Sequence, residues 1–594
     1  MARVRHTTIA PTAHVKVQQR SVRTRKFKPG AGNRNKTKRE PHRDSRPLKI
    51  IPLGGLCEIG KNMTAFEYGN DMFIIDCGMA FPEESMPGVD CVIQDYTYIR
   101  ENINKLRAVV LTHGHEDHIG GLTYFCREFK CPIYGGKLTV ELVRHKLIDN
   151  GVSLSGIDLE AHHNGDRVKI GNSFEIEFIR VNHSIADSYA IAIRTPAGIV
   201  VHSGDYKVDY TPINGKPIDL QRFGEIGKEG VLLFMCESTN VEIEGNSPSE
   251  RHVGEAFQRL FKDASGRIIV ATFSSHVHRM QQIITAAERY NRRVCLSGRS
   301  MLNVFKVANS LGYIDMDPET LIDISDIDQY DDDKVVILTT GSQAEPMSAL
   351  SRMAYASHKA VEIKKGDTVI ISADPIPGNE KPIYRVINEL YRLGATVIYH
   401  SLEDVHVSGH AYRNEIKLLH SLIKPKYVVP VHGEYRMLYL HKKLAESLGT
   451  PEENIFVMNN GDVLSLTPYS ARIIDSVPAS AVLIDGKGAA DIGSKILSDR
   501  RHLGEDGVVS IGLVIDAVKG TLLAPPEISS IGFVFEDEKY DIHREIAIKV
   551  ASTLPKSDIA SSVNKNSYKE QIRGLCFSKT RKRPMVIFNV IEMK

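Results

Sequence analysis

Long hydrophobic runs, paired cysteines and an apolar leader are all missing from this sequence. No apolar stretch reaches the roughly 18–20 residues that a membrane-spanning helix needs, so no membrane association is expected. The 8 cysteines are scattered and form no CxxC pair, which argues against a disulfide framework or a zinc ribbon. The basic start MARVRHTTIAP is followed by no apolar stretch, so a secretory signal peptide is not expected. Together these absences favour a protein of the reducing cytoplasm.

Acidic side chains are scarce in the first 48 residues. This segment has 14 Lys or Arg against only Glu40 and Asp44, and it therefore carries +12. Because the whole chain carries +2, the rest of the chain must carry −10. The segment lacks apolar periodicity, which predicts a disordered basic N-terminal tail over 1–48. Attraction to nucleic acid is favoured, since Lys and Arg neutralise phosphates, and a plain solvated tail is the alternative.

Short β-rich runs alternate with helical stretches over most of the remaining chain. The runs MFIID (72–76), AVVLT (108–112), FEIEFIRV (174–181) and GIVVH (198–202) predict strands in a layered α/β architecture. A second α/β stretch contains RIIVATF (267–273), VVILTT (335–340) and TVIIS (368–372), and YVVPV (427–431) returns to the style of the first. From about residue 480 the chain has strand patterns of its own, such as VVSIGLVID (508–516).

A glycine-rich segment near the first strand imitates a phosphate-binding loop. Residues 55–61, GLCEIGK, fit the pattern GxxxxGK. However, Asn62 replaces the Ser or Thr that would hold magnesium, Glu58 would repel phosphate, and the following residues do not have a helical pattern. A connection between two strands is therefore the better interpretation.

The strongest chemical signal is a run of metal-binding side chains after the apolar strand AVVLT. The run is His113-Gly114-His115-Glu116-Asp117-His118. Three imidazoles and a carboxylate within six positions would be a poor choice for a packed core, because each needs a polar partner. A loop after a strand lets such side chains converge, and His and Asp are good ligands for zinc or manganese.

Three further candidates have the same placement at the ends of predicted strands. His183 follows FEIEFIRV, Asp205 follows GIVVHSG, and His432 follows YVVPV. Each residue alone is a weak signal, because single histidines and aspartates are common. Their repeated position after strands makes one shared site the better explanation.

The motifs HGHEDH, NHS and SGD, in this order, resemble those of the metallo-β-lactamase superfamily. The resemblance implies an αββα sandwich in which two sheets lie between helices, with two divalent metal ions, zinc or manganese. Asp76, at the end of MFIID, would orient the metal loop rather than bind a metal. By the same resemblance, the first ion would be bound by His113, His115 and His183, the second by Asp117, His118 and His432, and Asp205 would bridge them.

The number of residues between the last two expected metal ligands, Asp205 and His432, distinguishes nucleases from small-molecule hydrolases. From Asp205 to His432 is 227 positions, which indicates an inserted α/β domain. Glu237 in MCESTN, His410 in HVSGH and His432 in PVHGE resemble the motifs of β-CASP nucleases, in particular the ribonuclease J family. The implied domains are the tail (1–48), the metallo-β-lactamase domain (49–236 and 386–475), the β-CASP domain (237–385), and a linker with a small C-terminal α/β domain (476–594).

Two loops are candidates for holding a phosphate backbone. Glycine allows a close backbone approach in HVSGH, and the turn in ATFSSHVHR precedes a predicted helix, whose N-terminus attracts anions. Ordinary loop chemistry is the alternative for both. His410 is expected to stabilise the scissile phosphate, and Glu237 and Asp117 to take part in catalysis. The expected substrate-binding residues are Ser275, His276, Val277, His406, Val407, Ser408, Gly409 and His410.

The resemblance implies a cytoplasmic ribonuclease. It would remove nucleotides 5′→3′ from single-stranded RNA, favour a 5′-monophosphate, and also cut internally in mRNA decay and rRNA maturation. A homo-oligomer (dimer or tetramer) is implied, and an RNA helicase or the ribosome are candidate partners of the tail. Two alternatives stay open: an RNA-binding scaffold subunit of a decay complex, and a structure-specific endonuclease for tRNA or DNA.

Overall fold

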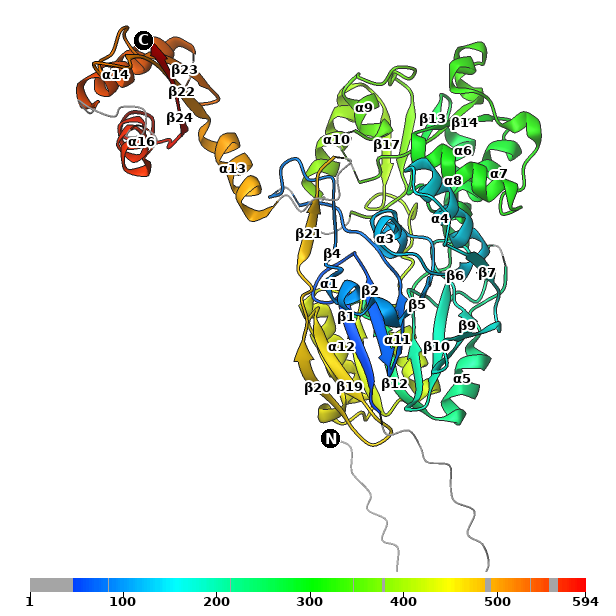
Figure 1. Cartoon of the computed structure of the whole chain (residues 1–594). Coiled ribbons are helices and arrows are strands. Elements are labelled where there is room, and N and C mark those ends of the chain that lie inside the picture. The colour runs from blue at the N-terminus through cyan, green and yellow to red at the C-terminus, as the bar shows by residue number, and fades with distance from the viewer. Residues whose placement is uncertain are drawn as a thin grey trace, which may run out of the picture. The chain divides into compact units, whose positions relative to one another are not determined.

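Two large β-sheets form the centre of the protein. The computed structural model describes residues 46–593, except 84, 214, 344, 346, 376–379, 487–492, 535, 555–562 and 564. Most of the predicted basic tail, residues 1–45, therefore lies outside the described residues. The first sheet has the order β20 (Ala471–Ser476), β19 (Asp462–Leu466), β1 (Leu48–Gly54), β2 (Met63–Tyr68), β3 (Asp71–Ile75), β5 (Leu106–Val110), β6 (Ile133–Gly136) and β7 (Leu159–His162) (Figure 1).

The second sheet has six strands and changes from antiparallel to parallel pairing. Its order is β18 (Tyr427–Val431), β12 (Val231–Glu237), β11 (Gly198–His202), β10 (Tyr189–Thr195), β9 (Phe174–Arg180) and β8 (Arg167–Ile170). The strands β8 to β11 pair antiparallel, whereas β11, β12 and β18 run parallel. β12 and β18 are completely buried, as expected of parallel strands that are covered on both faces.

Apolar side chains from both sheets meet in one central core. Phe66 and Phe73 of the first sheet stack with ring centroids 5.1 Å apart, and Phe73 meets Phe174 of the second sheet edge-on at 4.9 Å. Such aromatic pairs add to the stabilisation that comes from apolar burial. The two sheets therefore form the inner layers of a sandwich.

Helices cover the outer face of each sheet. The first sheet packs against α1 (Thr97–Glu101), α3 (Leu122–Glu128) and α4 (Lys137–Asp149), with the short α2 (Glu116–Ile119) in the loop after β5. The second sheet packs against α5 (Leu220–Glu229), α11 (Arg413–Ile423) and α12 (Tyr435–Ser447). The resulting αββα sandwich confirms the predicted fold. The glycine-rich segment 55–62 is the loop that joins β1 to β2, as predicted.

A second α/β domain is inserted between the parallel neighbours β12 and β18. Its five strands are all parallel, in the order β14 (Arg293–Ser297), β15 (Val335–Thr339), β13 (Ile268–Ala271), β16 (Thr368–Ile371) and β17 (Thr396–Tyr399). One face packs against α6 (Arg251–Asp263), α7 (Val277–Arg289) and α8 (Arg299–Ser310), and the other against α9 (Ala349–Ala354) and α10 (Glu380–Arg392). Helices on both faces explain the continuous apolar runs that the sequence shows here.

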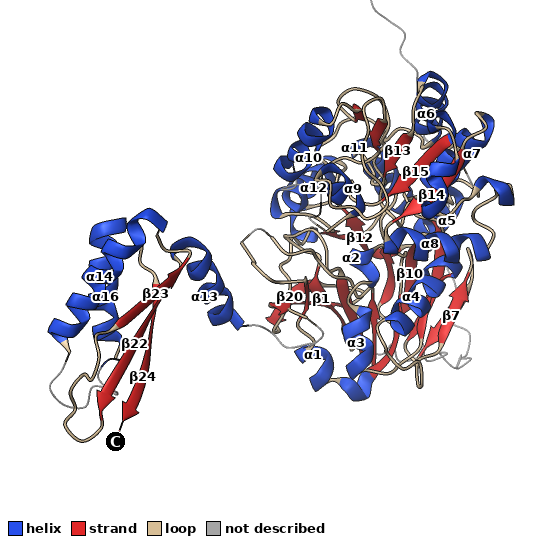
Figure 2. Ribbon diagram, turned by 90° about the horizontal axis from the view of Figure 1, so that it is seen from above, coloured by secondary structure: helices blue, strands red, loops and turns tan. Residues whose placement is uncertain are grey.

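The C-terminal part of the chain has a sheet and core of its own. Its three strands have the order β23 (Glu527–Ile531), β22 (Val508–Asp516) and β24 (Met585–Met593), and α14 (Glu536–Thr553) and α16 (Asn566–Thr580) pack on one face (Figure 2). β22 alternates buried and half-buried residues, which is the pattern of a sheet covered on one face. α13 (Gly493–Asp506) precedes this domain in the chain.

Two strands lie beyond the boundaries that the sequence predicts for the domains with which they pair. β17 belongs to the inserted sheet although it lies beyond residue 385, and β21 (Ala481–Ile484) lies beyond 475 yet pairs with β4 (Cys91–Gln94). Both are four-residue strands. β17 pairs with the preceding strand β16, whereas the partner of β21 is distant in sequence, so local patterning does not reveal that pair. The boundaries of the domains therefore remain predictions.

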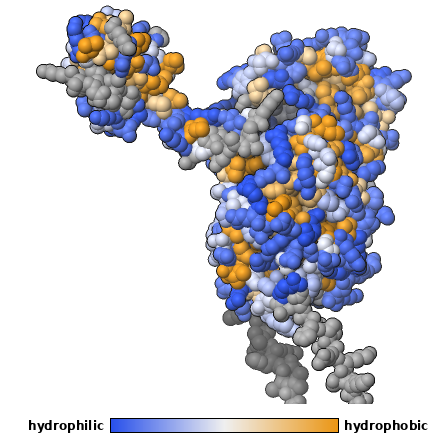
Figure 3. All heavy atoms as spheres, in the orientation of Figure 1, coloured by the Kyte–Doolittle hydropathy of each residue, from blue (hydrophilic) through white to orange (hydrophobic). Residues whose placement is uncertain are grey.

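On the face shown in Figure 3, hydrophilic residues predominate and apolar residues gather in separate patches. Within the described part of the chain, every helix is too short or too polar to cross a membrane.

A buried ion pair in the inserted domain gives a test of its packing. Arg267 donates to Asp367 from Nε at 2.9 Å and from Nη2 at 2.6 Å, and both side chains are almost fully buried. We expect Asp367→Ala to lower the free energy of unfolding by about 3–5 kcal/mol, because it leaves a buried guanidinium unpaired. Urea unfolding measures this. Asp332→Ala, which removes an exposed partner of Lys364, is the control and should cost about 0–1 kcal/mol. Equal unfolding midpoints for the two variants would contradict the expectation.

Candidate metal centre

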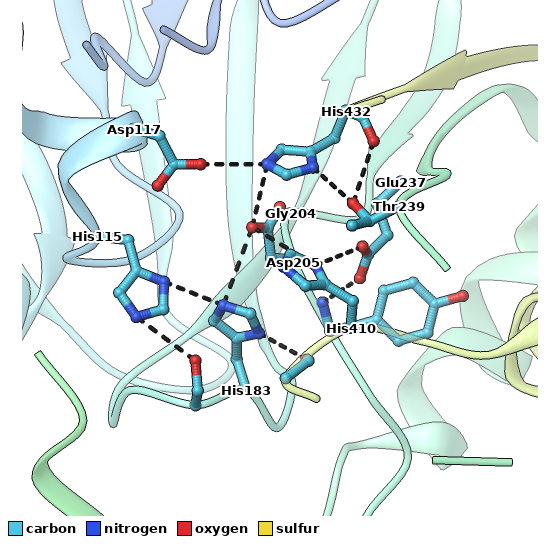
Figure 4. A network of polar contacts seen from close by, with 12 residues as sticks. His115, Asp117, His183, Gly204, Asp205, Glu237, Thr239, His410 and His432 are labelled. Atoms are coloured by element: carbon cyan, nitrogen blue, oxygen red, sulfur yellow. Dashed lines mark hydrogen bonds and ion pairs between the residues drawn. The ribbon is translucent and has the colours of Figure 1, made fainter. Parts of the chain in front are cut away.

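The predicted metal ligands follow strands whose carboxyl ends lie at one edge of the sandwich. β3 ends before Asp76, β5 before the HGHEDH loop, β11 before Asp205, and β18 before His432. In sheets with parallel strands, this edge is where ligands commonly bind. The sequence pattern of polar residues after apolar strands therefore becomes one cluster in space (Figure 4).

Three histidines form the first group of the cluster. His113 Nε2 lies 3.0 Å from His115 Nδ1, and His183 Nε2 lies 3.1 Å from the same His115 atom. His113 and His183 are buried and His115 is half-buried. Three ring nitrogens so close together can share one cation.

Two aspartates and two histidines form the second group. His432 Nε2 is 3.3 Å from Asp117 Oδ2, and His118 Nε2 is 3.4 Å from that same oxygen. Asp205 Oδ2 lies 3.2 Å from His118 Nε2 and 3.4 Å from His432 Nε2.

Asp205 is the carboxylate that connects the two groups. Its Oδ2 atom is also 3.7 Å from His113 Nε2 and 3.9 Å from His183 Nε2 of the first group. The close approach of its loop requires Gly204, which has φ +55° and where a Cβ would meet the Tyr189 carbonyl oxygen at 2.7 Å. The position of Asp205 is that of a carboxylate able to bridge two cations.

The protein holds His118 and His113, which follow β5, each through one ring nitrogen. His118 Nδ1 donates to Asp76 Oδ2 at 2.7 Å, which leaves Nε2 free to face the centre. Asp76 also accepts from the Thr112 amide and hydroxyl, both at 2.8 Å, and the Thr112 hydroxyl lies 3.1 Å from His113 Nδ1. This orienting contact through the second nitrogen is the usual arrangement around metal-binding histidines.

His183 and His432 are held in the same way by segments far away in the sequence. His183 Nδ1 donates to the Gly409 carbonyl oxygen at 2.6 Å, and His432 Nδ1 lies 2.7 Å from Thr239 Oγ1 (Figure 4). His432 also has φ +54°, a backbone conformation that is strained for a residue with a Cβ. The surrounding contacts must therefore fix this residue in place, and they direct its Nε2 atom to the centre.

Burial keeps the first group of histidines neutral. It lowers the pKa of His113 and of His183 well below the ordinary value, with a further contribution from neighbouring imidazoles, and it lowers the pKa of His115 to about 4. A neutral imidazole has the lone pair that a metal ion needs.

The carboxylates dominate the electrostatics of the second group. Burial lowers the pKa of His118, but Asp205, Asp117 and Asp76 outweigh it and raise that pKa well above the ordinary value. Burial also opposes ionisation of Asp117 and Asp205, yet the neighbouring His118 and His432 hold the pKa of both carboxyl groups well below the usual range. The group thus keeps anionic ligands for a divalent cation.

The donor set fits divalent metal ions. Imidazole nitrogens and carboxylate oxygens suit zinc and manganese, and the described donors within the two groups include no thiolate. One ring nitrogen of each of four histidines is held by the protein while the other faces the centre, which leaves the lone pairs in position. The cluster therefore has the chemistry of a divalent metal site.

A carboxylate–imidazole pair lies beside the cluster. His410 Nδ1 is 2.7 Å from Glu237 Oε2 and 3.9 Å from Asp205 Oδ2. Burial lowers the pKa of His410, but Glu237 and then Asp205 outweigh burial and raise it to about 9. His410 remains partly exposed, so this pair can reach a bound molecule as well as the cluster.

The predicted phosphate-binding residues at the start of α7 differ in how deeply they are buried. Ser275 is half-buried at the turn, whereas the side chain of Val277 is fully buried in the core. His276 is also buried and its Nε2 lies 3.2 Å from Glu250 Oε1. The backbone N–H groups of the two residues are also engaged, since that of His276 donates to the Phe273 carbonyl oxygen at 3.1 Å and that of Val277 to the Ser275 carbonyl oxygen at 2.9 Å.

The HVSGH segment lies against the metal cluster through its second half. Ser408 Oγ accepts hydrogen bonds from the Asn240 amide at 2.8 Å and from the His410 amide at 3.2 Å, while Gly409 holds His183. Val407 is buried, and His406 Nδ1 lies 3.2 Å from Arg279 Nη1. Ser408 to His410 therefore border the centre.

Three contributors to the site carry no sequence signal of their own. The Asn62 amide nitrogen lies 3.1 Å from His118 Nε2 and donates to the Asp117 carbonyl oxygen at 3.0 Å. Thr112 and Thr239 orient His113 and His432 through their hydroxyls. Such polar residues are common in loops, and only their position relative to the predicted ligands would have singled out Thr112.

Four family models match successive parts of the chain. The metallo-β-lactamase superfamily matches residues 59–212, and the β-CASP domain of ribonuclease J matches 265–390. The RNA specificity domain of Zn-dependent metallo-hydrolases matches 395–458, and the C-terminal domain of ribonuclease J matches 495–593. The fold and these matches define the protein as a metallo-hydrolase of the metallo-β-lactamase class.

Comparison with similar proteins identifies the family within this class. The chain is 45% identical over 491 residues to ribonuclease J of Synechocystis sp., covering 82% of this chain and 76% of that protein. It is 44% identical to ribonuclease J of Thermus thermophilus, over 83% and 86% of the two chains, and 41% identical to ribonuclease J 1 of Streptococcus pyogenes, over 91% and 96%. The chain therefore belongs to the ribonuclease J family, as its motifs predicted.

Asp76 gives a test of how the cluster is oriented. We expect Asp76→Ala to weaken divalent metal binding by about 10–100-fold, since His118 loses the partner that fixes its ring. Equilibrium dialysis against zinc or manganese, with metal content measured by mass spectrometry, gives the affinity. Asp71→Ala removes a carboxylate at the opposite end of the same strand and is the control. An unchanged affinity in Asp76→Ala would show that the ring is held without Asp76.

Proposed function

We propose that the protein is a metal-dependent ribonuclease that degrades single-stranded RNA 5′→3′, favours a 5′-monophosphate, and also cuts internally. The observation that supports this most is the convergence of seven metal-binding side chains next to the Glu237–His410 pair, which comes from the borders of the inserted domain. Membership of the ribonuclease J family supports RNA as the substrate, and roles in mRNA decay and rRNA maturation belong to the same proposal.

Two divalent ions, zinc or manganese, complete the proposed active site. His113, His115 and His183 would hold one, Asp117, His118 and His432 the other, and Asp205 would bridge them. Ions bound in this way lower the pKa of a water molecule to about 7 and neutralise charge on a phosphodiester. The chain itself contributes the fixed orientation of the imidazoles and a carboxylate, Asp117, that can accept a proton from water.

His410 and Glu237 are suited to the charge that develops on the scissile phosphate. The 2.7 Å contact between them fixes the His410 ring and stabilises its protonated form. A cationic imidazole can donate a hydrogen bond to a phosphate oxygen and stabilise the negative charge of the transition state. Glu237 acts by positioning His410 and can pass a proton through it.

The 5′ end of the RNA would be bound by loops of the inserted domain. The positive end of the α7 dipole favours an anion at this turn, and the half-buried Ser275 lies beside the helix start. A binding site for the terminal phosphate at a fixed distance from the metal ions would explain removal of nucleotides from that end. Self-association of the chain into a dimer or tetramer, and a helicase or ribosome as partners, are further parts of this proposal.

The decisive experiment uses single-stranded RNA labelled at its 3′ end and carrying a 5′-monophosphate, a 5′-triphosphate or a 5′-hydroxyl. With manganese or zinc we expect stepwise shortening from the 5′ end, fastest for the monophosphate. His115→Ala should reduce the rate by at least about 1,000-fold, since it removes a ligand of the first ion. Gel electrophoresis of timed samples measures the rate.

His145→Ala replaces an exposed histidine of α4 and is the control, which should cut as fast as the unaltered chain. Equal cutting by His115→Ala would refute the metal assignment. If the unaltered chain binds RNA but cuts none, the scaffold function replaces the nuclease. If it cuts DNA or structured tRNA and spares single-stranded RNA, a structure-specific endonuclease is the correct function.

The basic tail gives a second test. Deleting residues 1–44 should weaken binding to single-stranded RNA and reduce the slope of log affinity against log salt, because each phosphate contact contributes about 0.7 to that slope. Cleavage of a short substrate should stay unchanged, since the metal cluster lies wholly beyond residue 44. Fluorescence anisotropy at several salt concentrations measures the slope. An identical slope with and without the tail would mean that the tail does not contact RNA.

A further inference from the structure

A second group of metal-binding side chains lies in the outer layer of the sandwich. Cys236 of β12, His420 of α11 and His441 of α12 each direct one ligand atom toward the others, and these three atoms lie within 4.8 Å of one another. All three side chains are buried, and none of them belongs to the catalytic cluster. They are surrounded by apolar residues such as Phe234, whose ring meets His420 edge-on at 5.2 Å.

Hydrogen bonds within the protein do not satisfy this group. His420 Nε2 lies 2.9 Å from His441 Nε2, and His441 Nδ1 lies 2.9 Å from Ser238 Oγ. Two neutral imidazoles that face each other share a single proton, so each has one nitrogen in that bond. His420 Nδ1 is left buried without a hydrogen-bond partner. The protein therefore does not fix the His420 ring through Nδ1, and its Nε2 atom is directed by the contact with His441.

The Cys236 thiol has weak polar contacts. Its sulfur is 3.7 Å from the Tyr206 hydroxyl and also interacts with the Ser203 side chain, and burial raises the pKa of the thiol. Burial likewise lowers the pKa of His420 to about 4 and that of His441 well below its ordinary value, so both rings are neutral. A thiol and two neutral imidazoles are the donors that zinc and copper(I) prefer.

We propose that Cys236, His420 and His441 bind one soft d¹⁰ cation, Zn²⁺ or Cu⁺, at a structural site separate from the catalytic metals. On binding, the thiol loses its proton to solvent and a sulfur–metal bond forms, while each imidazole donates one lone pair. The donor set contains no carboxylate, so it discriminates against manganese and magnesium, which prefer oxygen.

The two imidazoles require only a small adjustment to accept an ion, and the sulfur lies within 4.8 Å of both ligand nitrogens. With bonds of about 2.0–2.1 Å and tetrahedral angles, zinc would place the two Nε2 atoms about 3.3–3.4 Å apart. They lie 2.9 Å apart, so the rings must separate by roughly half an ångström. Ser238, bonded to His441 Nδ1, then has the orienting role that accompanies most metal-binding histidines. Tyr206 or a water molecule is available as a fourth ligand of zinc.

The proposed ion would connect three elements that adjoin residues of the proposed catalytic site in the chain. β12 continues directly from Cys236 to Glu237, α11 follows the HVSGH segment, and α12 follows His432. A bond from each element to one ion fixes their relative positions. Its role is therefore structural, and it is distinct from catalysis by the two divalent ions.

The first measurement is the zinc and copper content of the full-length chain after mild chelation. It is compared with the variant His115→Ala/His118→Ala, which lacks catalytic ligands, and with Cys236→Ser and His420→Asn. We expect about one zinc or copper ion per chain to remain in the catalytic-site variant. This ion should be lost from Cys236→Ser and from His420→Asn. Which element remains identifies the ion.

The second measurement uses protein produced with cobalt(II) and its absorption spectrum. A thiolate bound to cobalt gives an intense charge-transfer band in the near ultraviolet, and the proposed catalytic ligands contain no thiolate. The band should be present in the unaltered chain and in the catalytic-site variant. It should also persist in Cys295→Ser, the control, because Cys295 is a fully buried cysteine of β14 outside the metal-binding groups.

The unaltered chain alone can overturn the proposal, even if the cluster variants fail to fold. Absence of zinc and copper from the catalytic-site variant, together with absence of the cobalt band from the unaltered chain, would show that the group is a thiol beside a hydrogen-bonded imidazole pair. A band that disappears in Cys295→Ser would place the thiolate site elsewhere and also refute it. Loss of catalytic activity in His115→Ala tests the proposed nuclease separately.

Discussion

The candidate metal centre depends on one constraint: a buried imidazole has two polar ring nitrogens, and both must be satisfied. In this protein the fold satisfies one nitrogen of His113, His118, His183 and His432 and turns the other toward a common centre. The orienting atoms are a carboxylate, two hydroxyls and a main-chain carbonyl. Asp76, Thr112 and Thr239 follow the ends of strands and Gly409 lies shortly before α11, so the precision of the centre comes mainly from the backbone of the sandwich.

The same constraint explains how a large insertion is compatible with a precise site. β12 and β18 are hydrogen-bonded neighbours, with Glu237 opposite Val431, although the inserted domain separates them in the chain. The chain leaves the sandwich after Glu237 and returns through His410, and the Gly409 carbonyl holds His183 on the way. The insertion therefore does more than add a domain, since its return segment orients a predicted metal ligand. A rearrangement of this segment would disturb the catalytic centre directly.

Much of the architecture could be predicted from the sequence because it rests on local patterns. Apolar strands followed by His or Asp indicated a layered α/β fold and a shared site. The resemblance of the motifs implied the sandwich and suggested Asp76, Glu237 and His410 as site residues. The orienting roles of Asn62 and Thr239 were not predictable, because they depend on contacts between segments that are distant in sequence. The same applies to β21, a short strand whose partner β4 is distant in sequence. Cys236, His420 and His441 resemble ordinary core residues until three elements bring them together.

Cys236 and Glu237 are neighbours in β12, and their side chains lie on opposite sides of the sheet. Cys236 faces the outer layer, and Glu237 faces the catalytic centre, because successive side chains of a strand point to opposite sides. The carboxylate of Glu237 is fixed at both oxygens: Oε1 accepts from the Tyr206 amide at 2.7 Å and Oε2 contacts His410 Nδ1 at 2.7 Å. Its own amide donates to Ser203 Oγ at 3.0 Å. A carboxylate held at both oxygens, on a residue whose main-chain amide is also bonded, leaves His410 little rotational freedom. The position of β12 therefore sets the geometry of the His410 imidazole, and any restraint on β12 from the outer layer acts on the catalytic centre through this single residue.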